Sequence, residues 1–77
     1  MTYEAFFESV KRQLWNYYEH LPEYKLLEYL KKEEDVIRDQ YDYWLEQVEI
    51  EGKEVTQQDI DAMASGATYS LYLLYEG

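Results

Sequence analysis

The chain has 77 residues, and its seventeen Asp and Glu side chains against seven Lys and Arg give a net charge of −10. This length fits one small domain, and the charge disfavours direct contact with nucleic acid or anionic lipid, because both repel an acidic protein. Cysteine is absent, which excludes a disulfide scaffold and a thiolate metal site.

The beginning of the chain, MTYEAFFESVKRQ, has an acid at Glu4 and no cationic region before an apolar run. It therefore does not read as a secretory signal. No apolar run approaches the ~20 residues that a membrane-spanning helix needs. We expect a soluble, cytoplasmic protein that makes no membrane contact.

The first part of the chain has the rhythm of an amphipathic helix. Apolar residues recur at intervals of three and four at positions 3, 6, 7, 10, 14, 17, 18 and 21. Thr2 is suited to the N-cap, and Pro22 disfavours helical geometry in the residue before it. The pattern predicts a helix over residues 3–20, with His20 at its C-terminal end.

Residues 22–49 contain no glycine and no second proline, and Pro22 suits the first turn of a helix. Their predicted core face is interrupted by Glu33 and Glu34, and it comprises Leu26, Leu27, Leu30, Ile37, Tyr41, Trp44, Leu45 and Val48. The segment is either one long helix whose middle turn reaches solvent, or two helices that break near residues 32–35. We favour the break, because burying two carboxylates on a core face costs several kcal/mol.

The last part of the chain predicts a loop and one more helix. Gly52 marks a turn within VEIEGKEVT, and Thr56 with Asp59 forms a near capping box that starts the helix. The core stripe of this helix is expected to contain Ile60, Met63, Ala64, Ala67, Leu71, Leu74 and Tyr75. A second stripe of small residues, Ala62, Gly66 and Ser70, either admits another helix or marks a kink at Gly66.

The C-terminal run YSLYLLYE is apolar on nearly every side, which indicates burial on more than one side. Either this helix is central to the domain, which we favour, or it makes a homodimer contact. Together the patterns predict an all-α fold. We expect a single domain over residues 1–77, a small antiparallel bundle of three helices, or of four if the middle helix breaks near 32–35.

The charge is concentrated in the middle of the chain. Five acids recur at spacings of four, three, four and three, opposite the predicted core face: Asp35, Asp39, Asp42, Glu46 and Glu49. Such a row is about 21 Å long, and only Arg38 lies beside it, within reach of Asp35 and Asp42. Like charges at this spacing destabilise a helix, here by about 1–2 kcal/mol in total.

This row is either a binding edge for a basic partner or an ordinary solvated face. Aromatic side chains near it strengthen the first interpretation, because exposed tryptophan and tyrosine are typical of interface hot spots. Tyr29, Val36 and Tyr43 are expected to flank the acids, and Trp15 to project from the first helix unless another helix covers it. The predicted partner-binding residues are Asp35, Asp39, Asp42, Glu46, Glu49, Tyr43 and Trp15.

The sequence offers no constellation for catalysis. His20 is the only histidine, the three glycines form no phosphate-binding loop, and no metal-binding spacing is complete. We therefore expect no enzyme activity, no cofactor and no metal.

Two functions fit these observations. In size, charge and helicity alone, the chain resembles the small DNA-mimicking inhibitors of mobile genetic elements, the anti-restriction and anti-CRISPR proteins. This resemblance implies a non-enzymatic inhibitor that docks on the basic surface of a nucleic-acid-binding protein, without touching nucleic acid itself. The alternative is a structural or assembly module that forms a homodimer through exposed aromatic residues. In that case the row of Leu30, Ile37, Tyr41, Trp44 and Val48 would be partly intermolecular.

Overall fold

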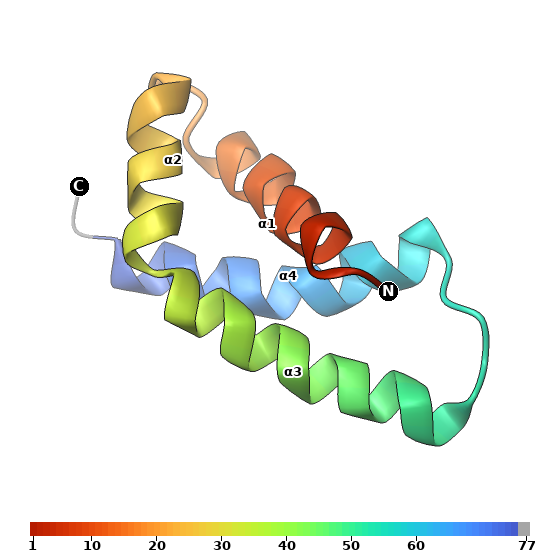
Figure 1. Ribbon diagram of the computed structural model, residues 1–77. Coiled ribbons are helices and arrows are strands. Elements are labelled where there is room, and N and C mark those ends of the chain that lie inside the picture. Colours follow the sequence, from red (N-terminus) through yellow and green to blue (C-terminus); the bar gives the residue numbers. More distant parts are fainter. Residues whose placement is uncertain (76–77) are drawn as a thin grey trace.

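The structure, a computed structural model, describes residues 1–75. Within this range the chain forms helices and no strand (Figure 1): α1 (Tyr3–Tyr17), α2 (Glu23–Lys32), α3 (Glu34–Glu51) and α4 (Gln57–Leu74). The predicted all-α bundle is confirmed, in its four-helix version.

The middle segment breaks at Glu33, within the predicted range. Glu33 has φ −102° and ψ 22°, which ends α2, and α3 begins at the next residue. The side chains of Glu33 and Glu34 stay partly exposed, while Leu30 and Ile37 on either side are fully buried. The break thus keeps two carboxylates in contact with water and avoids the cost of burying them.

Three helix starts follow from local sequence. The Thr2 hydroxyl accepts a hydrogen bond from the Ala5 N–H at 3.1 Å, as an N-cap should. The predicted capping box is complete: Thr56 accepts from the Asp59 N–H at 3.2 Å, and Asp59 accepts from the Thr56 N–H at 3.1 Å. Pro22 stands one residue before α2, at its N-cap position.

Two predicted boundaries were wrong. The first helix ends at Tyr17 instead of residue 20, because Tyr18 leaves helical geometry and the Leu21 N–H closes a turn onto the Tyr18 carbonyl. His20 therefore lies in the turn, not at a helix end. The helix before Gly52 continues to Glu51, where Gly52 at φ 66° ends it, so the predicted loop is shorter.

The helices do not all alternate in direction. The α3 and α4 helices are antiparallel neighbours, whereas α1 and α4 run the same way (Figure 1). Ser9 in α1 bonds Asp61 near the start of α4, and Tyr18 after α1 bonds the carbonyl of Tyr72 near its end. The short α2 makes this possible, because it stands across the end of the bundle and turns the chain back into α3.

All four helices supply the core. Its buried members are Phe6, Val10, Leu14, Leu26, Leu30, Ile37, Ala64, Ala67 and Leu71. Leu27, predicted on the same face, is 38% exposed, because only one side of the short α2 meets the bundle. No helix within residues 1–75 is long and apolar enough to cross a membrane.

The α4 helix packs against both α1 and α3 and passes through Gly66 without a kink. Gly66 therefore ends no helix. No other part of the described chain covers it either, because a Cβ built at Gly66 would meet nothing within 4 Å. The core side of α4 is central to the bundle, and its opposite side is open.

Candidate functional site

The five predicted acids lie on one exposed side of α3, which we call the α3 acidic face. Asp35, Asp39, Asp42, Glu46 and Glu49 are all exposed, and α3 is one uninterrupted helix over the whole of this range. At a rise of 1.5 Å per residue the row is about 21 Å long. Because Ile37 on the other side is fully buried, the helix cannot turn these carboxylates inward.

No cation within residues 1–75 pairs with these five carboxylates. The ion pairs of this range join Lys11 to Glu23, Arg12 to Asp61, and Arg38 to Glu34. Arg38 was expected to reach Asp35 and Asp42. Instead its guanidinium bonds Glu34 at 3.1 Å and lies 4.3 Å from the centre of the Tyr3 ring. The row is therefore not neutralised by any ion pair within the described residues.

Of the aromatic residues predicted to flank the acids, only Tyr43 is exposed on α3. Its side chain is 54% exposed, and its ring meets that of Trp44 edge-on at 5.0 Å. Tyr29 and Val36 were wrongly placed on the flank, because both are partly buried against the core. The Tyr29 hydroxyl instead donates to the Leu71 carbonyl at 2.6 Å.

One exposed apolar neighbour of Tyr43 on α3 was not predicted from the sequence. Ile50 is 72% exposed and lies seven residues, or two turns, beyond Tyr43 on α3. Ile50 was not placed on this helix because it belongs to the alternating VEIEGKEVT segment, which was expected to form a loop. Tyr43 and Ile50 thus lie two turns apart along one edge of the α3 acidic face.

Trp15 does not join this group. Its indole is partly buried and packs against the core, so less of the ring is accessible to a partner than was expected. In the described chain the ring contacts from α1 to α3 come from Tyr3 and Phe6, which both meet Tyr41. The structure therefore brings together six of the seven predicted residues on α3 and keeps Trp15 on another helix.

The proposed intermolecular row is also accounted for within one chain. Leu30 and Ile37 are fully buried, and Tyr41, Trp44 and Val48 are partly buried. Tyr41 donates its hydroxyl to the Met1 carbonyl at 3.1 Å. The buried members of this row pack in the protein's own core, while Trp44 and Val48 also line an open hollow.

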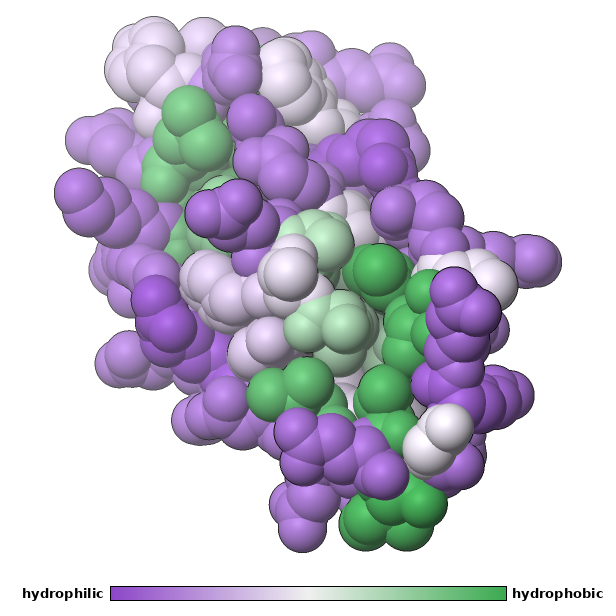
Figure 2. All heavy atoms as spheres, turned by 45° about the vertical axis from the view of Figure 1, so that its right-hand side comes forward, coloured by the Kyte–Doolittle hydropathy of each residue, from purple (hydrophilic) through white to green (hydrophobic). Residues whose placement is uncertain are grey.

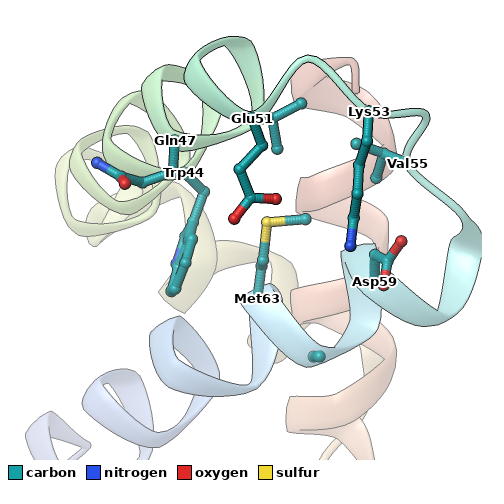
Figure 3. Close-up of a pocket in the computed structure, with 9 residues that line it drawn as sticks. Trp44, Gln47, Glu51, Lys53, Val55, Asp59 and Met63 are labelled. Atoms are coloured by element: carbon teal, nitrogen blue, oxygen red, sulfur yellow. The ribbon is translucent and has the colours of Figure 1, made fainter.

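An apolar hollow of about 290 Å³ opens between the end of α3 and the start of α4. Figure 2 shows apolar side chains gathered in this region, with hydrophilic ones around them. In Figure 3, Trp44, Glu51 and Lys53 reach from α3 and the connection toward Met63 and Asp59 of α4. The Trp44 Nε1–H is buried without a hydrogen-bond partner in the described residues. The hollow is large enough for one bulky side chain of a partner.

A second polar cluster joins α1 to α4. Asp61 accepts hydrogen bonds from the Ser9 hydroxyl at 2.6 Å and from Gln57 at 3.0 Å, and it pairs with Arg12. The Ser9 hydrogen bond, Gln57 and Arg12 together lower the pKa of the Asp61 carboxyl. All three groups contact the same oxygen, Oδ1, and the contacts with Ser9 and Arg12 join α1 to α4, so this cluster is structural.

The titratable side chains of the described residues form no metal site. Within residues 1–75 no three side chains of His, Cys, Asp or Glu are grouped so as to hold a metal ion. His20 is exposed in the turn after α1. Near α3 the surface offers a row of unpaired carboxylates, the exposed Tyr43 and Ile50 beside it, and an apolar hollow.

Comparison of the chain with protein-family models, with curated proteins and with solved structures finds no match.

Proposed function

We propose that this chain is a non-enzymatic binding protein that docks the α3 acidic face on a basic surface of a nucleic-acid-binding protein. The observation that supports the proposal is the row itself. Five exposed carboxylates follow about 21 Å of one helix, and no cation of the described chain pairs with them. A partner that supplies lysine and arginine would relieve the repulsion within this row.

The overall charge supports the same kind of partner. A protein of net charge −10 is attracted to basic surfaces over a distance of about one Debye length, roughly 8 Å at physiological salt. Such steering raises association rates by about 10- to 10³-fold. Nucleic acid itself is repelled, so the chain would not bind nucleic acid. It would instead compete with nucleic acid for the partner protein.

The spacing of the charges indicates how far the imitation of nucleic acid goes. The row carries roughly one charge per 4–5 Å, whereas a duplex has one per ~1.7 Å and each of its strands one per ~3.4 Å. The α3 acidic face is thus closer to the phosphates of one strand than to a whole duplex. In this proposal it replaces the contacts that a basic groove makes with a single strand.

The exposed side chains of Tyr43 and Ile50 would add apolar binding energy, which salt does not screen. Both side chains are more than half exposed at the edge of the acidic row. A partner with an apolar side chain among its basic residues would bury them, and aromatic residues of this kind carry much of the energy at interfaces. We place this activity in the cytoplasm, the compartment that fits a chain without cysteine.

Affinity capture from a cell extract at low salt tests the proposal. The triple variant Asp39→Lys, Asp42→Lys, Glu46→Lys changes the net charge from −10 to −4, because each reversal adds two charges. The matched control, Glu19→Lys, Glu28→Lys, Glu54→Lys, makes the same change at exposed acids outside the face. We expect the native chain and the control to retain the same basic nucleic-acid-binding proteins, and the triple variant to lose them. If the triple variant retained them equally well, the α3 acidic face would not be the binding surface.

A further inference from the structure

The side of α4 that points away from the core is exposed and apolar. Ala62, Gly66, Tyr69 and Leu73 recur at spacings of four, three and four, opposite the buried Ala64 and Leu71, and we call them the α4 outer face. Tyr69 is 58% exposed and Leu73 is 63% exposed. Leu74 is exposed as well, so its predicted place in the core stripe was wrong. Contiguous exposed apolar surface is typical of association sites.

This face differs from the rest of the protein in its charge. From Ala62 to Tyr75 the sequence contains no charged side chain, although 31% of all residues are charged. The uncharged face is about 17 Å long from Ala62 to Leu73. The α3 acidic face lies on a different helix, so the two surfaces are separate.

The charge distribution also limits what can cover the α4 outer face. Nucleic acid and anionic lipid are repelled by the net charge of −10. Two copies of the chain repel each other wherever their carboxylates meet. They can approach closely where neither copy carries a charge, and the α4 outer face offers such a place.

We propose that the α4 outer face is the interface of a homodimer, in which α4 of one copy packs on α4 of the other. A twofold arrangement brings the same face of both copies together, so Tyr69 and Leu73 of each bury the apolar surface of the other. Gly66 leaves room at the centre, since no atom lies within 4 Å of a Cβ built there. One helix face is a small interface, so the dimer is weak and depends on concentration.

This inference does not depend on the function proposed for the α3 acidic face, and salt distinguishes them. Binding of a basic partner weakens as salt rises, because salt screens attraction between opposite charges. The homodimer responds in the opposite direction, because salt screens the repulsion between two copies that each carry −10.

Sedimentation equilibrium of the pure chain tests the homodimer. We expect dimer to increase with protein concentration between about 10 µM and about 1 mM, and to be favoured by higher salt. Leu73→Glu should weaken the dimer by at least ~10-fold, because it places a carboxylate from each copy in the interface. Tyr69→Glu is a second variant with the same expectation.

Ile50→Glu is the matched control, since it introduces the same charge at an exposed apolar residue of α3. It should leave the dimer unchanged, and circular dichroism should give the same helix content for all variants. A chain that stays monomeric at the highest concentration and at both salts would overturn the proposal. So would an equal loss of dimer in Leu73→Glu and Ile50→Glu.

Discussion

The Tyr29 hydroxyl donates to the main-chain carbonyl of Leu71 over 2.6 Å and so ties the short α2 to the last turns of α4. The α2 helix has only ten residues and two fully buried side chains, Leu26 and Leu30. A helix of this length is marginal without tertiary contacts. The bond therefore helps to hold the element that turns the chain from α1 into α3.

Replacing Tyr29 by phenylalanine should lower the free energy of unfolding by about 1 kcal/mol, because the ring stays and one hydrogen bond is lost. Urea unfolding followed by circular dichroism measures this change. Tyr24→Phe is the matched control, since Tyr24 is exposed on the same helix and makes no hydrogen bond through its hydroxyl within the described chain. Equal stability of Tyr29→Phe and the native chain would mean that the bond contributes nothing.

The raised pKa of Tyr29 should make the free energy of unfolding depend on pH in alkali. Burial, and next the charge of Glu33, raise the pKa of Tyr29 to about 12. Its unfolded pKa is about 10, so between the two values the native state holds a proton that the unfolded state has lost. The contribution of Tyr29 is complete below pH about 10 and disappears as pH rises toward 12. The alkaline loss of stability should be shallower in Tyr29→Phe than in the native chain.

The cluster around Asp61 should matter at acid pH. Its pKa is lowered by the Ser9 hydrogen bond first and then by Gln57 and Arg12, so its contribution is complete above the unfolded pKa of about 4. That contribution is lost as pH falls through the lower, folded value. Asp61→Asn should therefore reduce the dependence of stability on pH below about pH 4. An unchanged acid limb of the stability curve would contradict this role.

Ser9→Ala should destabilise the protein by about 1–2 kcal/mol, because it removes the donor to Asp61 and the acceptor of a 3.0 Å bond from Gln13. The double variant with Asp61→Asn should cost less than the sum of the single variants, since Ser9 and Asp61 share one bond. Chemical unfolding of the four proteins gives this coupling directly. Strict additivity would show that the two side chains act independently.

Repulsion between the carboxylates of the α3 acidic face should destabilise the protein. Alternating positive and negative side chains along the row should remove this repulsion. In the double variant Asp39→Lys, Glu46→Lys every neighbouring pair along the row becomes attractive. We expect a gain of about 1–2 kcal/mol at low salt, largely lost in 1 M salt. The control Glu19→Lys, Glu54→Lys has the same net charge but alters exposed positions outside the helices. If both double variants gained equally, total charge and not the row would be the cause.

Two glycines should respond to alanine in opposite directions. Gly66 lies inside α4, where alanine is favoured by about 1 kcal/mol and its Cβ would meet nothing within 4 Å. Gly52 has φ 66°, a left-handed conformation that costs other residues about 1–2 kcal/mol. Thermal unfolding of dilute, monomeric protein should show Gly66→Ala stabilised and Gly52→Ala destabilised. Stabilisation by both changes would contradict the geometry at Gly52.

The features of the fold that depend on neighbouring residues were predictable from sequence. The N-cap at Thr2, the capping box at Thr56 and the break near Glu33 all follow from residues within a few positions of each other. The row of acids on α3 depends only on helical spacing and on the burial of Ile37. The ion pair of Glu34 with Arg38 has the same local origin, since it joins positions four apart, and could have been anticipated.

The features that were missed depend on tertiary structure. The bond from Tyr29 spans 42 positions and the bond from Ser9 spans 52, and no local pattern predicts either. Tyr29 was expected to flank the acids because the orientation of α2 relative to α3 at the break was not known. Ile50 was hidden because Gly52, two residues on, suggested an earlier end to the helix.

Competition with nucleic acid tests directly whether the α3 acidic face replaces nucleic acid on its partner. A nucleic-acid-binding protein captured by the native chain is mixed with its own nucleic acid at about 100 mM salt, and complexes are separated by native electrophoresis. The account predicts mutual exclusion: the chain displaces the nucleic acid, while the Asp39→Lys, Asp42→Lys, Glu46→Lys variant does not. A stable ternary complex of chain, partner and nucleic acid would contradict it.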